Sequence, residues 1–268
     1  MTGRDAVFSE DMAAFYDRWA VPLFGPYADD MARRVRHTEP GAVLEVAAGT
    51  GIVTEALARA LPQSAAIVAT DLNQAMVDFA AARRGDARVG WRQADALALP
   101  FDAGCFDVVV CQFGAMFYPD RVAGHREARR VLREGGHYLF SAWDSTEHNP
   151  DGAVVEDAVA AIHPVPRPGF LRRVPFAYHD ADAIRRDLWQ AGFAHCTIDR
   201  VTSTWHAASA DEVALSYCHG TPLRAEIEAV APGGLDLATQ AVAAAIAARF
   251  GVVRPAMPRR ALVVEALK

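Results

Sequence analysis

Three acidic side chains, Glu45, Asp71 and Asp95, stand at or near the carboxyl ends of three runs of residues that are typical of β-strands. Gly49 and Gly51 follow the first run, and a Gly-x-Gly turn between a strand and a helix lets a nucleotide-like ligand approach the backbone. A carboxylate about twenty residues further on, here Asp71, can accept hydrogen bonds from both hydroxyls of a ribose. These residues predict a nucleoside site at one edge of a parallel sheet.

The residues around the glycines distinguish two classes of nucleotide. A dinucleotide site favours glycine or alanine at the position of Thr54, because the helix must pack closely and present its N-terminus to a pyrophosphate. Glu45 would repel a pyrophosphate but would suit an ammonium group, and Asp95 could accept a hydrogen bond from an adenine amino group. The acids therefore favour a cationic amino-acid nucleoside, S-adenosylmethionine. The alternative for Asp71 is that it only caps the next helix.

The elements that would hold these residues follow from the spacing of apolar side chains. Five strands are expected at 43–46, 65–71, 89–96, 106–113 and 137–143, with helices at 52–61, 74–84 and 120–134 between them. Further strands are expected at 195–201 and 261–267. Strands that alternate with helices predict an α/β fold with a doubly wound, mostly parallel, seven-stranded, Rossmann-like sheet.

Further helices are expected before the first strand and between the last two strands. Before the first strand, a helix from Phe8 should end at Pro22 and a second should begin near Pro26, so that both cover the cleft at the carboxyl ends of the strands. Near the end of the chain, a helical insertion is expected over about 203–258, with helices at 209–217, 221–230 and 235–250. The first of these begins with a capping box, Ser209-x-x-Glu212.

Length and composition indicate a single globular domain. The 268 residues are 52% hydrophobic and 22% charged, with a formal net charge of −6, which argues against a nucleic-acid surface. We expect an N-terminal helical cover at 1–40, a donor-binding core at 41–143 and an acceptor-side half at 144–268. The four cysteines are scattered, so no metal site is expected. The absence of a signal-like start and of any apolar run of membrane length favours a soluble, cytoplasmic protein that acts without a membrane.

Five motifs in order give the chain a resemblance to a known family. They are VLEVAAGTG (43–51), ATD (69–71), ADALALPF (94–101), FDVV (106–109) and RVLREGG (130–136). With these motifs, residues 10–143 resemble the class I S-adenosylmethionine-dependent methyltransferases. The likeness is to the methyltransferase type 11 kind, which includes quinone-biosynthesis C-methyltransferases. Ala47 stands where that family usually has glycine, and its methyl group is expected to narrow the turn.

The resemblance implies roles for individual residues. Glu45 would face the methionine amino group of the donor, Asp71 its ribose, and Asp95 with Ala96 its adenine. Gln112 and Phe113 would border the donor, and Tyr16 or Trp19 would close over it, unless these two only pack in the core. The full set of cofactor-binding residues expected on this basis is Tyr16, Trp19, Glu45, Ala47, Gly49, Gly51, Asp71, Leu72, Asp95, Ala96, Gln112 and Phe113. The resemblance also implies that the last strand is antiparallel.

The acceptor side carries weaker signals. Met116, Phe117, Tyr118 and Trp143 follow or end strands, so they are candidates for the walls of an acceptor cleft, with core packing as the alternative. Such an apolar cleft suits a small aromatic, prenylated or other secondary-metabolite acceptor, methylated on O, N or C. If a general base is needed, the candidates are His148 and His219, and with less support His125 and His163; no catalytic residue is assigned.

Three functions remain open from the sequence. The first is methyl transfer from S-adenosylmethionine, with S-adenosylhomocysteine as product, to a small molecule. The second is a nicotinamide-dependent oxidoreductase, which Thr54 and the pair Glu45 and Asp95 disfavour. The third is a non-catalytic module that binds S-adenosylmethionine. A monomer or a homodimer is compatible with each of them, and no nucleic-acid partner is expected.

Overall fold

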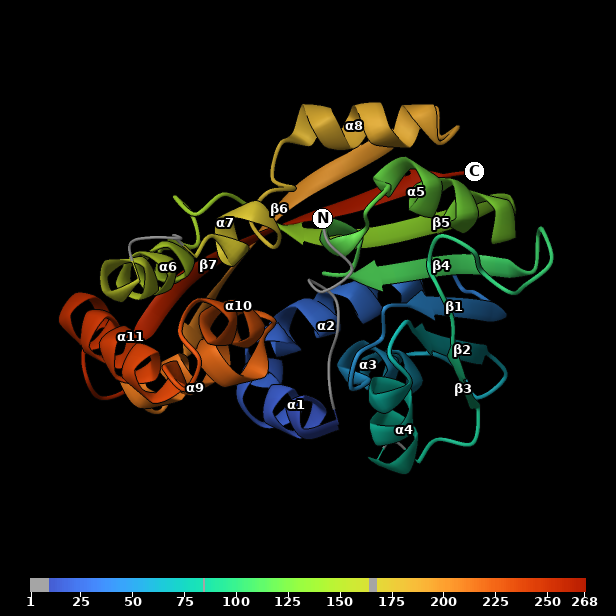
Figure 1. Cartoon of the computed structure of the whole chain (residues 1–268). Coiled ribbons are helices and arrows are strands. Elements are labelled where there is room, and N and C mark those ends of the chain that lie inside the picture. Colours follow the sequence, from blue (N-terminus) through green and yellow to red (C-terminus); the bar gives the residue numbers. More distant parts are fainter. Residues whose placement is uncertain (1–9, 84, 164–167) are drawn as a thin grey trace.

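The fold is organised around one seven-stranded sheet (Figure 1). The computed structural model describes residues 10–83, 85–163 and 168–268. The strands are β1 (Ala42–Val46), β2 (Ala66–Asp71), β3 (Val89–Gln93), β4 (Phe106–Gln112), β5 (Leu132–Trp143), β6 (Cys196–His206) and β7 (Ala256–Leu267), in the spatial order β3-β2-β1-β4-β5-β7-β6. The expected doubly wound sheet is confirmed.

The order of the strands reverses between β1 and β4. β1 pairs in parallel with β2 on one side and with β4 on the other, so that Glu45 lies beside Ala69 and Val110. β7 is antiparallel to both of its neighbours, β5 and β6, as the resemblance implied. In open α/β sheets, a ligand crevice forms outside the carboxyl ends of the strands at such a reversal.

The helices cover the two faces of the sheet and the carboxyl ends of its parallel strands. Their bounds are α1 (Glu10–Phe15), the π-helical segment η1 (Tyr16–Ala20), α2 (Val21–His37), α3 (Ile52–Ala60), α4 (Gln74–Arg83), the 3₁₀ turn η2 (Ala115–Phe117), α5 (Arg121–Val131), α6 (Pro150–Ile162), α7 (Phe170–Arg173), α8 (Ala181–Gln190), α9 (Ala210–Gly220), α10 (Leu223–Val230) and α11 (Leu235–Phe250). In Figure 1, α6, α7 and α9–α11 gather beyond the carboxyl ends of the parallel strands.

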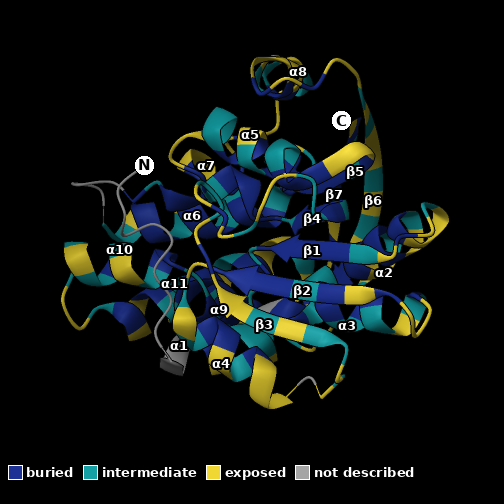
Figure 2. Ribbon diagram, turned by 90° about the vertical axis from the view of Figure 1, so that its right-hand side faces the viewer, coloured by how far each residue is buried: buried dark blue, intermediate teal, exposed yellow. Residues whose placement is uncertain are grey.

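Alternate residues of the central strands bury the two faces of the sheet. Val43 packs in one hydrophobic cluster with Met31 of α2 and Leu57 of α3. The next residue, Leu44, packs in a second cluster, which includes Leu188 of α8 and side chains of α5. Successive side chains of a strand point to opposite faces, so α2 with α3 and α5 with α8 lie on opposite sides. Figure 2 shows β1 and β2 buried between these layers and the edge strand β3 partly exposed.

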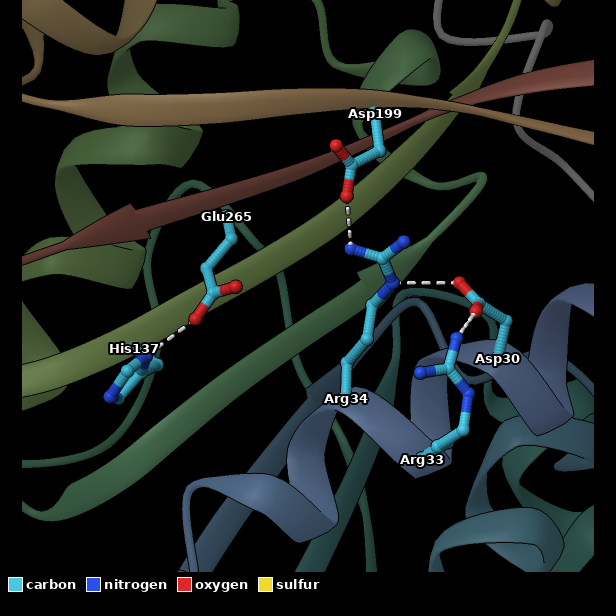
Figure 3. A network of polar contacts seen from close by, with 6 residues as sticks. All are labelled: Asp30, Arg33, Arg34, His137, Asp199 and Glu265. Carbon is cyan, nitrogen blue, oxygen red and sulfur yellow. Dashed lines mark hydrogen bonds and ion pairs between the residues drawn. The ribbon is translucent and has the colours of Figure 1, made fainter.

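An ion pair ties α2 to β6, an edge strand from the second half of the chain (Figure 3). Arg34 donates from Nη1 to Asp199 Oδ2 and from Nε to Asp30 Oδ2, both at 2.7 Å. His137 of β5 and Glu265 of β7 form a second contact at 2.7 Å within the sheet. The Arg34–Asp199 and His137–Glu265 contacts join residues more than one hundred positions apart in the sequence, so the two halves of the chain share one framework.

Two boundaries at the N-terminal side differ from the prediction. Pro22 does not end the first helix but stands in the first turn of α2, where proline's fixed φ is compatible with a helix. Pro26 does not begin the second helix but lies inside it, and the buried side chains of Leu23 and Tyr27 on either side keep this segment packed as a helix. The predicted start at Phe8 and the predicted end at Arg84 of the helix after β2 lie outside the described residues.

Three later boundaries also differ. The predicted helix 120–134 ends at Val131, because Leu132 already pairs with Phe106 as the first residue of β5. Gly135, with a φ of 75°, then lets β5 pass through a register shift before the regular pairing at His137. The predicted helical insertion 203–258 is shorter, since residues 203–206 extend β6 and pair with 256–259 of β7. Thr202, Thr204 and Trp205 are residue types that favour a strand.

Candidate functional site

A cavity of about 230 Å³ opens at the reversal of strand order. Its walls come from the residues at or just beyond the carboxyl ends of the four neighbouring strands β1 to β4, from the start of α4 and from the loop that includes η2. They are Tyr16, Val46, Ala47, Gly49, Asp71, Leu72, Asn73, Met76, Ala94, Asp95, Ala96, Leu97, Gln112, Phe113, Gly114, Phe117, Tyr118 and Pro119. We call this space the first cavity.

The glycine turn after β1 forms one wall of the first cavity. Ala47, Gly49 and Gly51 have φ values of 57°, 56° and 86°, which lie in the left-handed region. Gly49 and Gly51 adopt this conformation without the penalty that a Cβ brings, whereas Ala47 adopts it at a cost of about 1–2 kcal/mol. Gly114 approaches this turn so closely that a Cβ on it would lie 2.5 Å from the Cβ of Ala47.

Asp71 connects the turn to the start of α4. Its Oδ2 accepts a hydrogen bond from the backbone N–H of Gly49, and its Oδ1 accepts one from that of Asn73, both at 2.9 Å. Burial raises the pKa of Asp71, and these hydrogen bonds oppose the rise because they favour the ionised carboxylate. Asp71 therefore holds the residues before α4 and also lines the first cavity.

Glu45 lies buried behind the turn rather than in the wall of the first cavity. It is 2% exposed, and Thr54 Oγ1 donates a hydrogen bond to its Oε2 at 2.6 Å. Desolvation raises the pKa of Glu45 to about 8, against the lowering effect of the Thr54 hydroxyl. In the sequence, Thr54 served only as evidence against a dinucleotide site. In the structure, its hydroxyl orients Glu45, the acid that precedes the turn.

Two further residues of the first cavity, on either side of the turn after β1, carry an exposed and an unsatisfied polar group. Asp95 is exposed, and its Oδ1 accepts a hydrogen bond from the backbone N–H of Leu97 at 2.9 Å. Gln112 lines the cavity, and its buried Oε1 has no hydrogen-bond partner among the described residues. Such an atom is a candidate for a contact with a bound ligand or water.

Tyr16 is the N-terminal aromatic residue that covers the turn. A Cβ added at Gly49 would lie 3.8 Å from Tyr16 Cε1, and burial together with Asp71 and Asp17 raises the pKa of the Tyr16 hydroxyl. Trp19 is half-buried under the guanidinium of Arg18, 4.5 Å from its ring centroid, and does not belong to the lining of the first cavity. Of the two aromatic candidates, the structure brings Tyr16 to the first cavity.

A second cavity of about 100 Å³ adjoins the first and shares Tyr16, Phe113 and Phe117 with it. Its lining is largely aromatic and aliphatic and comes mostly from η1, α2, α7, α9 and the ends of β4 and β5. The lining residues are Tyr16, Leu23, Phe24, Phe113, Met116, Phe117, Trp143, Phe170, Leu171, Pro175, Phe176, Ser216, Tyr217, Gly220, Thr221, Pro222 and Arg259. Three predicted acceptor-side residues, Met116, Phe117 and Trp143, line it, whereas Tyr118 lines the first cavity.

The histidine candidates lie apart from both cavities within the described part of the chain. His125 is buried between the hydroxyls of Tyr138 and Tyr178, and burial lowers its pKa to about 3. His148 lines a separate surface pocket near β6 and β7, and His219 contacts Thr239 and stacks on Phe15. No described group of three His, Cys, Asp or Glu side chains has an arrangement that could hold a metal ion.

The sequence interpretation missed Arg259, which is 2% exposed and contributes to the second cavity. The signal was present, since Met257, Arg259 and Ala261 alternate with more exposed residues as the buried face of one strand does. The prediction ended the insertion at about 258 and began this strand at Ala261, so that Arg259 was assigned to neither element. Gly51, also predicted at the site, caps α3 and does not belong to the lining of the first cavity.

Comparison with known proteins assigns to a family the segment that contains most residues of the first cavity. A family model described as a methyltransferase domain matches residues 43–136. This segment is a methyltransferase domain. The matched segment includes the turn after β1, Asp71, Asp95 and Gln112. The match confirms the resemblance to the class I S-adenosylmethionine-dependent methyltransferases.

A curated relative is similar to this methyltransferase domain over part of its length. The ubiquinone/menaquinone biosynthesis C-methyltransferase UbiE of Geotalea uraniireducens is 34% identical over 108 residues, which are 39% of this chain and 46% of that protein. The chain spans less than half the length of this relative and of other curated relatives that it matches.

Solved structures share the fold over more of the chain. A putative methyltransferase from Bacillus halodurans has a TM-score of 0.55 at 20% identity and covers 85% of this chain and 92% of its own. A phosphoethanolamine N-methyltransferase from Haemonchus contortus, solved with phosphomonomethylethanolamine and S-adenosylhomocysteine, has a TM-score of 0.52 at 16% identity over 85% of this chain and 49% of its own. None of the described helices is long and apolar enough to cross a membrane.

Proposed function

We propose that the protein transfers a methyl group from S-adenosylmethionine to a small-molecule acceptor. The observation that supports this most is the first cavity, where the methyltransferase domain brings its glycine turn, Asp71 and Asp95 to one side of the sheet. In this proposal the first cavity holds the donor, with Asp71 at the ribose and Asp95 and Ala96 at the adenine. Gln112 and Phe113 border the donor, and Tyr16 covers it.

The methionine end of the donor lies, in this proposal, toward Glu45 and the shared wall of the two cavities. The second cavity then receives the acceptor, and Tyr16, Phe113 and Phe117 flank the place where donor and acceptor meet. A sulfonium is its own leaving group, since it departs as a neutral thioether when the acceptor atom attacks the methyl carbon in line. The contribution of the protein is to hold the two reactants about 3 Å apart in a largely apolar space.

The acceptor class follows from the lining of the second cavity. Aromatic side chains such as Phe24, Trp143 and Phe176 suit a flat, apolar molecule. Because a relative is a quinone-biosynthesis C-methyltransferase, hydroquinones and naphthols with and without prenyl chains are the first acceptors to examine. No histidine of the described chain lines either cavity, so the proposal includes no histidine base.

Methyl transfer can be tested with a donor that carries an isotope-labelled methyl group. The purified protein is incubated with labelled S-adenosylmethionine and a panel of hydroquinones, naphthols and aromatic amines, and products are detected by mass spectrometry. We expect S-adenosylhomocysteine and one labelled acceptor, and a strong loss of both with Asp71→Asn. Asp78→Asn, which changes an exposed acid on α4, is the matched control. Donor binding without transfer to any acceptor would favour a non-catalytic binding module.

A further inference from the structure

The second cavity, which is otherwise largely apolar, contains a buried cation. Arg259 reaches it from β7 and is 2% exposed. Its guanidinium carbon lies 5.1 Å from the ring centroid of Trp143, 5.4 Å from that of Trp205 and 5.9 Å from that of Tyr217. Aromatic faces stabilise a guanidinium in this way, so they fix the position of the charge beside the cavity.

One nitrogen of the Arg259 guanidinium is already held. Its Nη2 forms an ion pair with Asp151 Oδ2 and donates to the Tyr217 hydroxyl at 2.6 Å. The Tyr217 hydroxyl in turn donates to Asp151 Oδ2 at 2.8 Å. Both hydrogen bonds that the guanidinium makes within the described residues start from Nη2, although an arginine has five N–H donors on three nitrogens. Nε and Nη1 remain for another partner.

Several neighbouring polar atoms are also unsatisfied. Arg259 Nε, Asp151 Oδ1, Trp205 Nε1 and the Tyr27 hydroxyl are buried and have no hydrogen-bond partner among the described residues. Tyr27 packs edge-on against Trp143 at 5.3 Å, and Arg259 and Asp151 both act on its pKa, so these atoms belong to one region. Of these four residues, Arg259 lines the second cavity. Buried polar groups are almost always paired in folded proteins, so its unpaired Nε indicates a missing polar partner at the cavity.

We propose that Arg259 binds an anionic oxygen of the acceptor, and that the acceptor is an aromatic molecule with a phenolate or carboxylate group. The aromatic ring contacts the apolar wall formed by residues such as Phe24, Phe113 and Trp143, and the oxygen accepts a hydrogen bond from a free N–H of the guanidinium, on Nε or Nη1. Asp151 and Tyr217 are positioning residues, because they hold Arg259 through Nη2. The assignment of this ligand as the acceptor rests on the proposed function.

The proposal can be tested by ligand binding without any turnover. The probes are 2-naphthoate and 2-naphthol, with 2-methylnaphthalene as the ligand of the same skeleton that lacks oxygen. Each is titrated into the protein with and without saturating S-adenosylhomocysteine, and binding is followed by the fluorescence of the tryptophans, two of which flank Arg259. We expect 2-naphthoate to bind at least tenfold more tightly than 2-methylnaphthalene.

Variants show whether Arg259 causes this preference. Arg259→Met should weaken 2-naphthoate binding at least tenfold and change 2-methylnaphthalene binding less than threefold. Arg200→Met is the matched control, because Arg200 is an exposed arginine on the neighbouring strand β6. Arg259→Met leaves the Asp151 carboxylate buried without its counterion, so the double variant Arg259→Met/Asp151→Asn, which removes both charges, keeps the test independent of a folding defect.

The outcomes separate this proposal from the proposed function. Equal binding of all three probes to the wild-type protein, or an oxygen preference that persists without Arg259, would overturn the assignment of Arg259. If S-adenosylhomocysteine does not bind while the Arg259-dependent preference remains, the anion site stands and the methyltransferase proposal fails.

Discussion

At the scale of single residues, the buried carboxyl of Glu45 couples the proposed donor site to pH. Its pKa of about 8 in the unliganded protein means that it is mostly protonated at neutral pH. A donor ammonium nearby would favour the ionised form, so binding should release a proton. Affinity for S-adenosylhomocysteine should therefore rise as the pH rises from about 6 to 7.5, by up to about tenfold per pH unit.

Calorimetry at several pH values, in buffers of different ionisation enthalpy, measures both the affinity and the proton release. Glu45→Gln preserves the shape of the side chain and removes its titration, so this variant should show a flatter profile. An unchanged slope in Glu45→Gln would assign the pH dependence to another group. In the empty protein, the raised pKa also implies stability that is present below about 4.5 and lost as the pH rises through about 8, and Glu45→Gln should remove this loss.

Ala47 gives a second prediction at this scale. Its φ of 57° is unfavourable for alanine, so Ala47→Gly should stabilise the fold by about 0.5–1 kcal/mol, after allowance for the greater freedom of glycine in the unfolded chain. Gly114→Ala should destabilise it by about 1–3 kcal/mol, because the new Cβ would lie 2.5 Å from that of Ala47. In the double variant, removal of the Ala47 methyl group should recover part of this loss.

Urea denaturation of the two single variants and the double variant gives the coupling energy between these positions. We expect a coupling of at least about 0.5 kcal/mol, as for residues in contact. Additive effects would mean that the clash of the new Cβ with Cys111 Sγ, at 2.8 Å, accounts for the cost alone.

At the scale of elements, α5 supports the first cavity through Gly124. A Cβ on Gly124 would lie 2.5 Å from the ring of Tyr118, which lines that cavity. Gly124→Ala should therefore cost about 1–3 kcal/mol of unfolding free energy and weaken S-adenosylhomocysteine binding, because the ring must move. The control is Gly90→Ala on the edge strand β3, where the nearest atom to a new Cβ is 4.0 Å away, and which should be stabilised by about 0.5–1 kcal/mol.

Urea denaturation measures the unfolding free energies of the two variants, and calorimetric titration measures their affinities for S-adenosylhomocysteine. A Gly124→Ala variant as stable as Gly90→Ala, with unchanged affinity, would show that α5 and the Tyr118 ring adapt freely.

The sequence predicted those elements whose local signals agree with their packing. The apolar runs of β1, β2 and β4, the glycine turn and the helix at 235–250 have the predicted positions, because periodicity and turn residues indicate the same structure. The prediction failed where packing decides. Pro26 lies within α2, and Leu132 belongs to β5 rather than to the preceding helix, because its partner Phe106 is distant in the sequence.

At the scale of the whole molecule, the continuous sheet joins the two halves of the chain. β7 and β6, from the second half, continue the sheet beside β5, so we expect one cooperative unfolding transition. Far-UV circular dichroism and tryptophan fluorescence should give the same midpoint. S-adenosylhomocysteine at 100 times its Kd should raise stability by about 2.7 kcal/mol and the Tm by roughly 5–10 °C. Two separate transitions, with only one shifted by ligand, would contradict a single domain.

The candidate site was predictable only in part at this scale. The acids at successive strand ends indicate a nucleoside cavity, because parallel strands bring their carboxyl ends to one edge. The second cavity depends on how α7, α9 and β7 assemble, and no local pattern brings Arg259, Asp151 and Tyr217 together. The roles proposed for individual residues at both cavities stay predictions that binding experiments must test.

The central claim is that the first cavity binds the methyl donor, and calorimetric titration of S-adenosylhomocysteine tests it most directly. We predict one site with a Kd in the micromolar range and no binding of NADH. Asp71→Asn should weaken binding by roughly 10–100-fold, because it removes a charged hydrogen-bond acceptor, whereas Asp78→Asn should bind as the wild-type protein does. Binding of NADH in place of S-adenosylhomocysteine, or equal affinities of Asp71→Asn and Asp78→Asn, would contradict the account.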